Sequence, residues 1–164
     1  MQGIEINLQQ MLNRREQRAI QQQEFLKKYS CPLVSFSMNI PGPIKTNEQI
    51  LKAFTLGKTE LLEKLKPFEI LNSLEIYEST GDELLLAVDA DAVNLKNIAV
   101  QIENNSPVGR LFDIDIINFD GKKLSRENFR KCLICDKQAQ ECARSRTHSV
   151  SEMQIAVEKL LSGL

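Results

Sequence analysis

The stretch from Gly109 to Ile117 places two aspartates, Asp113 and Asp115, inside an otherwise apolar run that favours a β-strand. Aspartate is depleted in strands, so the pair needs a physical reason. In a strand, residues i and i+2 point to the same face at a separation of roughly 7 Å. The sequence therefore predicts a strand with one doubly acidic face and one apolar face, the latter formed by Phe112, Ile114 and Ile116.

Two carboxylates on one strand face repel each other. At about 5 Å and an effective dielectric constant of about 20, the repulsion is roughly 3 kcal/mol, which a divalent cation or a basic partner removes. Carboxylate oxygens are ligands that Mg²⁺ prefers, and Mg²⁺ commonly serves phosphate-bearing substrates. Asp113 and Asp115 therefore predict a Mg²⁺ site with a catalytic role. The alternative is a solvated strand face near a turn.

Length and composition indicate a globular chain with a single domain, residues 1–164. Of its residues, 42% are hydrophobic and 26% are charged, which is typical of folded proteins. Within this domain we expect an amino-terminal helix in residues 1–30 and a helical segment that carries cysteines and a histidine in residues 130–164. No apolar run is long enough for a bilayer and no secretory signal is evident, so we expect a cytoplasmic protein without a membrane partner.

Charge is strongly segregated although the formal net charge is only −1. Residues 60–120 hold 13 Asp or Glu and 4 Lys or Arg, whereas residues 121–148 hold 8 Lys or Arg and 3 Asp or Glu. A basic face beside a carboxylate pair suits metal-assisted chemistry on a polyphosphate. Nucleic acid could use the same face, but with no Trp and only 2 Tyr the chain has little surface for stacking bases, so we expect no nucleic-acid partner.

Periodicity and capping residues predict four helices. The first runs from Asn7 to about Tyr29, the second from Thr46 or Asn47 to Pro67, the third begins after Asp91, and the last contains Met153 to Leu161. In the first helix, Leu8, Leu12, Ala19, Phe25 and Leu26 are assigned to the apolar side, and Arg14, Arg15 and Arg18 to the solvated side.

Alternation and turn residues predict the strands. They are Leu33–Met38, then Phe68–Glu78 and Glu83–Asp89 joined by a hairpin through Thr80-Gly81-Asp82, then the strand with the two aspartates, which turns at Asp120-Gly121 toward Lys122-Lys123-Leu124. The sum is a mixed α/β fold of α+β type, with a largely antiparallel sheet flanked by helices. We expect the acidic strand at a central or near-central position.

Three residues near the acidic strand and the first connection suit phosphate binding. Gly109 and Arg110 immediately precede the acidic strand, so a permissive backbone point and a guanidinium lie where a phosphate near Asp113 would reach. Lys45 follows Pro41-Gly42-Pro43 and precedes a helix start, a second candidate phosphate contact. A plain rigid turn also explains the Pro-Gly-Pro connection. Gly57-Lys58-Thr59 is not a phosphate loop, because it lies inside a helical pattern.

Cysteine and histidine form a second cluster in the sequence, Cys132-x2-Cys135-x6-Cys142-x5-His148. A Cys-x2-Cys turn is the usual first half of a tetrahedral zinc site, so these four residues predict a structural Zn²⁺. In one alternative, Cys135 and Cys142 are buried on one helical face and His148 bonds locally. In another, His148 is a general base. A redox Cys-x-x-Cys lacks the expected βαβ context.

Five motifs follow one another in a fixed order along the chain. They are Pro32-Leu33-Val34-Ser35-Phe36, Pro41-Gly42-Pro43-Ile44-Lys45, Pro107-x-Gly109-Arg110-Leu111-x-Asp113-x-Asp115, Leu124-Ser125-Arg126 and Cys132-Leu133-x-Cys135-x6-Cys142-x-Arg144-x3-His148. Together these motifs, which span residues 32–148, resemble the holo-acyl-carrier-protein synthases of citrate lyase, also called apo-citrate lyase phosphoribosyl-dephospho-CoA transferases.

The resemblance implies a nucleotidyl-type transfer. Such enzymes take 2′-(5″-triphosphoribosyl)-3′-dephospho-CoA and attach its phosphoribosyl-dephospho-CoA part to a serine of the citrate lyase acyl carrier protein (the γ chain), releasing pyrophosphate. It implies that Asp113 and Asp115 hold Mg²⁺ and that Arg110 and Lys45 bind the triphosphate. Basic residues that would meet phosphates or the carrier are Arg126, Arg130, Lys131, Arg144 and Arg146.

Two other functions are consistent with the same residues. One is the corresponding transfer to the malonate decarboxylase carrier, and the other is a noncatalytic, zinc-stabilised module that binds a carrier. The paired aspartates are similar to those of nucleotidyltransferases of the polymerase-β type, but the Gly-Ser helix start of that superfamily is missing here. The likeness in fold is therefore an analogy, and Asp89 and Glu75 are candidates for a third carboxylate.

Overall fold

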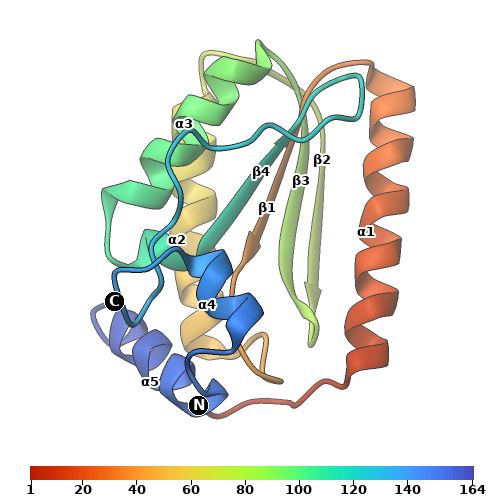
Figure 1. Ribbon diagram of the computed structural model, residues 1–164. Helices are drawn as coiled ribbons and strands as arrows, with labels where there is room; N and C mark the ends of the chain where they lie inside the picture. Colours follow the sequence, from red (N-terminus) through yellow and green to blue (C-terminus); the bar gives the residue numbers. More distant parts are fainter.

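The computed structural model describes residues 1–164 as a mixed α/β domain (Figure 1). Four antiparallel strands form one sheet in the order β2-β3-β1-β4: β1 (Leu33–Met38), β2 (Glu69–Glu78), β3 (Gly81–Asp89) and β4 (Phe112–Ile117). The helices are α1 (Leu8–Tyr29), α2 (Glu48–Leu65), α3 (Ala92–Asn105), α4 (Ala139–Ser145) and α5 (Val150–Leu161), with a 3₁₀ turn η1 (Val108–Leu111) before β4. The predicted fold class is confirmed.

Polar side chains start the helices where the sequence predicted. The side chain of Asn7 accepts a hydrogen bond from the Gln10 amide in a capping box, and the side chains of Asn47 and Asp91 accept hydrogen bonds from backbone amides in the first turns of α2 and α3. Such caps satisfy backbone N–H groups that have no partner inside the helix. None of the helices has the length and apolar character needed to cross a bilayer.

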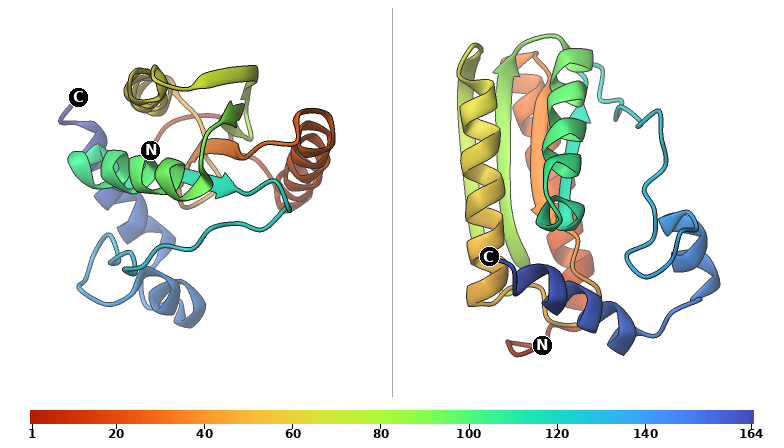
Figure 2. Two further views of the ribbon diagram at one scale, coloured as in Figure 1. Left: turned by 90° about the horizontal axis from the view of Figure 1, so that it is seen from above. Right: turned by 90° about the vertical axis from the view of Figure 1, so that its left-hand side faces the viewer.

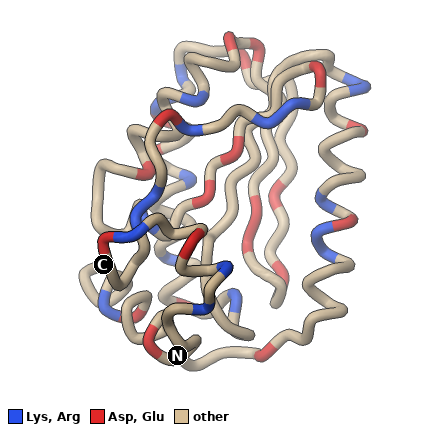
Figure 3. Tube along the Cα trace, viewed as in Figure 1, with Lys and Arg blue, Asp and Glu red and all other residues tan.

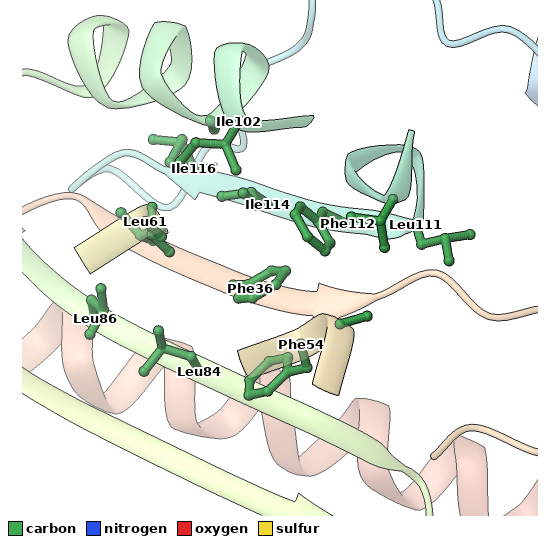
Figure 4. Close-up of a cluster of buried hydrophobic side chains, with 14 of the residues drawn as sticks. Phe36, Phe54, Leu61, Leu84, Leu86, Ile102, Leu111, Phe112, Ile114 and Ile116 are labelled. Atoms are coloured by element: carbon green, nitrogen blue, oxygen red, sulfur yellow. The ribbon is translucent and has the colours of Figure 1, made fainter. Parts of the chain in front are cut away.

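Helices cover both faces of the sheet (Figure 2). α2 and α3 lie on one face and enclose the main core, which Figure 4 shows around Phe36, Phe54 and Phe112. The rings of Phe36 and Phe54 stack with centroids 4.8 Å apart. Gly57 in α2 permits this packing, because a Cβ there would lie 2.7 Å from Cζ of Phe36. The Gly-Lys-Thr tripeptide is thus a packing feature inside a helix.

β4 lies at the edge of the sheet, so the expected central position of the acidic strand is wrong. After the turn at Asp120-Gly121 the chain forms a single bridge, between Ile117 and Lys123, rather than another strand. Side chains satisfy the free edge instead. Glu103 accepts a hydrogen bond from the Ile114 amide at 2.9 Å, and Arg130 donates to the Phe112 carbonyl oxygen at 2.5 Å. This protects an edge that would otherwise pair with another chain.

α1 covers the other sheet face, and its buried side differs from the predicted one. Leu8 and Leu12 are 73% and 45% exposed, whereas Arg14 is only 3% exposed, so the assignment of Arg14 to solvent is wrong. Farther along the helix, Phe25 and Leu26 lie on the buried side as predicted. They pack on a small apolar cluster that includes Leu33 and Leu85. Arg14 is buried because polar side chains of the sheet lie beneath the amino-terminal half of α1 and can pair with its guanidinium group.

The hairpin between β2 and β3 turns earlier in the sequence than predicted. Glu78 pairs with Gly81, so Ser79 and Thr80 form the turn and Gly81 opens β3. Gly81 has φ of +118°, a conformation that glycine adopts readily and other residues rarely do. The consequence is that Asp82 and Glu83 belong to β3, next to β1.

Candidate functional site

The sheet face beneath α1 carries the predicted acidic pair. Ser37 on β1 is in register with Asp113 on β4 and with Glu83 on β3, and Ser35 is in register with Asp115. Residues opposite each other in antiparallel strands point to the same face. We call this set of five residues the polar sheet face. Asp113 and Asp115 therefore project together, as the alternation of the sequence predicted, while Phe112 and its alternate neighbours enter the core.

The two aspartates are half-buried and their charge is only partly balanced. Burial raises the pKa of the Asp113 carboxyl, and the negative charge of Asp115 raises it further. Lys123 lies 2.5 Å from Asp115 Oδ2, and Lys123 and Arg130 lower the pKa of Asp113 without cancelling the shift. Two carboxylates that project from one sheet face are a donor set that suits a hard divalent cation.

A cavity of about 130 Å³, the small cavity, opens beside Asp113. Arg15 and Arg18 of α1, Lys45 and Ser37 line it together with Asp113. Lys45 Nζ donates to the carbonyl oxygen of Ile40 at 2.6 Å, and burial and the nearby Arg15 lower the pKa of Lys45. The structure thus brings the predicted residues Lys45 and Asp113 to one cavity, whose other charged lining residues are Arg15, Arg18, Asp82 and Glu83.

Glu83 holds two arginines on the side of α1 that faces the sheet. Its carboxylate accepts hydrogen bonds from Arg14 Nε and Nη2, at 3.0 and 2.6 Å, and from Arg18 Nε and Nη2, at 3.0 and 2.5 Å. Burial alone would raise the pKa of Glu83, but the two guanidinium groups hold it below its usual value. Bidentate pairing restricts both guanidinium planes, so Arg18 reaches the small cavity in a fixed orientation.

The sequence analysis did not predict that Arg15, Arg18 and Glu83 line the small cavity. A signal was present, because Arg14, Arg18 and Phe25 follow helical spacing and so share the side of α1 that ends in the apolar cluster.

The two candidates for a third carboxylate lie elsewhere. Asp89 is exposed at the end of β3, and Glu75 pairs with Lys58 at 2.9 Å on β2. The third carboxylate on the polar sheet face is Glu83.

Gly109 and Arg110 lie away from the small cavity. A Cβ at Gly109 would be 2.7 Å from the Ile102 carbonyl oxygen, so this glycine permits close packing of η1 on α3. Arg110 Nη2 donates to the carbonyl oxygens of Lys131 and Cys132, at 3.2 and 2.7 Å. Arg110 therefore connects η1 to the segment that carries the cysteines.

Cys132, Cys135, Cys142 and His148 converge in space, with ligand atoms that all lie within 4.8 Å of one another. Cys135 Sγ is 3.5 Å from Cys142 Sγ and 3.3 Å from His148 Nε2. A disulfide would need about 2.05 Å, whereas thiolates around a tetrahedral Zn²⁺ with bonds of about 2.3 Å lie roughly 3.8 Å apart. Because α4 begins at Ala139, the alternative with Cys135 and Cys142 on one helix is wrong. The cluster can hold a metal ion.

Comparison with known proteins identifies the family. A family model described as apo-citrate lyase phosphoribosyl-dephospho-CoA transferase matches residues 6–163. The chain belongs to this family. A relative of that name from Citrobacter koseri is 36% identical over 162 residues, covering 95% of this chain and 88% of the relative. Another from Escherichia coli is 34% identical over 163 residues, covering 96% and 89%. The resemblance seen in the sequence is confirmed, and it covers nearly the whole transferase chain.

Proposed function

We propose that this chain transfers the phosphoribosyl-dephospho-CoA group from 2′-(5″-triphosphoribosyl)-3′-dephospho-CoA to a serine of the citrate lyase acyl carrier protein, with release of pyrophosphate. The observation that carries the proposal beyond family membership is the small cavity, where Asp113, which shares its sheet face with Asp115, lies beside three basic side chains. A triphosphate needs both kinds of group. Positive side chains balance its charge, and carboxylates hold the cation that accompanies it.

The reaction assigned to this site is a nucleotidyl-type transfer. The carrier serine hydroxyl loses its proton to solvent as its oxygen forms a bond to the phosphorus nearest the ribose, and the bond from that phosphorus to the departing pyrophosphate breaks. Arg15, Arg18 and Lys45 bind and orient the triphosphate and balance the charge of the leaving group. Glu83 acts through Arg18, which it holds at the cavity wall.

Asp113 and Asp115 are the residues that would hold Mg²⁺. The fit is chemical, because both offer oxygen ligands on one sheet face and because burial and the charge of Asp115 raise the pKa of Asp113, an effect that a bound cation would oppose. When bound, Mg²⁺ lowers the negative charge on the attacked phosphate. The carboxylates themselves set its position, because β4 is fixed to β1 by the strand ladder.

Pyrophosphate release tests the proposed reaction. With the precursor and the apo-carrier present, we expect about one pyrophosphate per carrier, measured with a coupled pyrophosphatase assay. A carrier whose acceptor serine is replaced by alanine is the matched control and releases none. Release that is equal for both carriers would mean hydrolysis of the precursor, and no release with either carrier would favour a noncatalytic module that binds the carrier.

We also propose that the cysteine and histidine cluster holds a structural Zn²⁺. Arg110 contacts the carbonyl oxygens of Lys131 and Cys132, and the Cys132 amide donates to the Lys137 carbonyl oxygen at 2.8 Å. Leu133 packs on the main core, but most of the loop is open to solvent, because Lys131, Ile134 and Lys137 are exposed. Metal coordination would supply the missing stabilisation, since structural Zn²⁺ contributes directly to folding free energy.

Metal content and thermal unfolding test the zinc proposal. Untagged protein should contain about one zinc per chain by inductively coupled plasma mass spectrometry. Cys135→Ser should lose that zinc and unfold at a lower temperature, because it removes one of four ligands. Cys31→Ser is the matched control, since Cys31 is buried on the α1 side of the sheet, outside the cluster, and it should keep the metal. Wild-type protein that is fully folded without metal would contradict the proposal.

A further inference from the structure

A second and larger cavity, of about 900 Å³, lies between α3, η1 and the segment 124–131. We call it the large cavity. Basic residues dominate its charged lining, with Lys96, Arg110, Arg126, Arg130 and Lys131 against only Glu103 and Glu127. Figure 3 shows basic positions along the chain segment that follows β4 and passes in front of α3. The lining therefore carries an excess of positive charge, which an anionic ligand would balance.

One buried carboxylate holds part of this lining in place. Glu103 is 3% exposed, and its Oε1 lies 2.5 Å from Arg130 Nη2, while its Oε2 lies 3.5 Å from Arg126 Nη2. Arg130 Nη2 also donates a hydrogen bond to the Phe112 carbonyl oxygen, and Arg126 Nη2 donates one to Asn104 Oδ1 at 3.1 Å. The two guanidinium groups are thus preorganised by protein contacts before any ligand arrives, which reduces the entropy lost on binding.

Two basic groups in the large cavity have donors without a protein partner. Arg126 Nε is buried without a hydrogen bond, as is the acceptor Glu103 Oε2, and Lys96 is only 8% exposed yet makes no ion pair. Burial lowers the pKa of Lys96, while Glu103 and Asp115 act to raise it. Unsatisfied buried donors are costly. A phosphate group in the cavity would supply acceptors to these donors.

The lining also includes an aromatic ring and several amides. Phe129 is 74% exposed and lines the large cavity. Such an exposed ring offers a surface on which a nucleobase stacks. Asn97, Gln101 and Asn104 line the same space and offer donors and acceptors suited to the edge of a base. A basic cluster beside an exposed ring and amides matches a nucleoside diphosphate better than a bare inorganic anion.

We propose that the large cavity binds the adenosine diphosphate half of the substrate, while its triphosphate occupies the small cavity. This inference rests on the proposed function, whose precursor carries both groups. The two cavities flank the same strand, since Asp113 lines the small one and Arg130, bonded to the neighbouring Phe112, lines the large one. A substrate with two separate phosphate clusters would place one cluster on each side of β4.

Binding of 3′-dephospho-CoA tests the assignment, because this molecule carries the adenosine diphosphate and lacks the triphosphoribosyl group. In isothermal titration, Phe129→Ala and the double variant Arg126→Gln, Lys131→Gln should each raise its Kd by about tenfold, since a stacked base and charged hydrogen bonds are each worth about that much. Lys45→Met should leave this Kd unchanged. Inorganic triphosphate should show the opposite pattern, with its Kd raised by Lys45→Met alone.

Phe129→Ala should leave the fold intact, because this side chain is mostly exposed. A change in Kd for this variant therefore reports binding and not misfolding. A matched control for charge is Lys27→Gln with Lys52→Gln, on the exposed surfaces of α1 and α2, which should not alter either Kd. Unchanged dephospho-CoA binding in the large-cavity variants, with normal carrier modification, would overturn this inference and leave the proposed function standing. Loss of carrier binding alone in those variants would also overturn it, by showing a docking surface. Failure of the wild type to modify the carrier would instead overturn the proposed function.

Discussion

Replacing Asp113 with asparagine should nearly abolish transfer while making the protein more resistant to heat. The expected loss of kcat/KM is roughly a thousandfold, since a metal held by carboxylates contributes several kcal/mol of charge stabilisation. The asparagine is similar in size and keeps the strand, whose ladder to β1 uses backbone groups. Initial rates of pyrophosphate release give the kinetic effect, and circular dichroism shows that the fold is retained.

The thermal effect follows from the direction of the pKa shift. Burial and Asp115 raise the pKa of Asp113 in the folded state, so folding favours the protonated form, and the associated stability is lost as pH rises through that pKa. At neutral pH the ionised carboxylate destabilises the fold. Asp113→Asn removes this charge and should raise the unfolding temperature, measured in EDTA.

Asp89→Asn is the matched control for both effects. Asp89 is exposed at the end of β3 and lies outside the small cavity, so this variant should keep normal transfer and a normal unfolding temperature. An Asp113→Asn protein that retains the wild-type rate would contradict the assignment of the acidic pair. One that is less stable than wild type would show that Asp113 has a structural role.

Glu83→Gln should cause the largest loss of stability among single polar substitutions. Arg14 is 3% exposed, and Glu83 is its only acidic partner. Removing one member of a buried ion pair leaves an uncompensated charge and costs about 3–5 kcal/mol. Urea denaturation at neutral pH measures this loss directly. Glu75→Gln, which removes an exposed pair with Lys58, is the control and should cost about 1 kcal/mol or less.

The loss caused by Glu83→Gln should also depend on pH. Because the folded pKa of Glu83 lies below its usual value, the carboxylate stabilises the fold above the unfolded pKa of about 4.3. That contribution is lost as pH falls through the lower folded pKa. Wild type and variant should therefore differ most near pH 7 and converge in strong acid. A difference that stays constant from pH 7 to pH 3 would contradict the ion pair as its source.

Local chemistry explains why most of the fold could be predicted. Asn7, Asn47 and Asp91 start helices through contacts within three residues of themselves. The strict alternation around Asp113 and Asp115 assigned the two faces of β4 correctly. Both signals operate within a few residues, so the sequence carries them without knowledge of the rest of the molecule.

Errors arose where distant segments decide the outcome. The order of the strands depends on which edge remains unpaired, and the burial of Arg14 depends on Glu83, which is 69 residues away. Arg110 is near Asp113 in sequence, but its side chain contacts the Cys132 carbonyl oxygen instead. For the same reason the sequence did not place Arg15 and Arg18 beside Lys45, although together they line the small cavity.

The intact mass of the apo-carrier shows whether Asp113 and Asp115 support transfer of the prosthetic group. Carrier, triphosphoribosyl precursor and Mg²⁺ are incubated with wild-type protein or with the double variant Asp113→Asn, Asp115→Asn, and a parallel sample contains EDTA. We expect a mass gain equal to the precursor minus pyrophosphate with wild type alone, absent in the double variant and in EDTA. An equal gain with the folded double variant would contradict the acidic pair of β4 as the site of transfer.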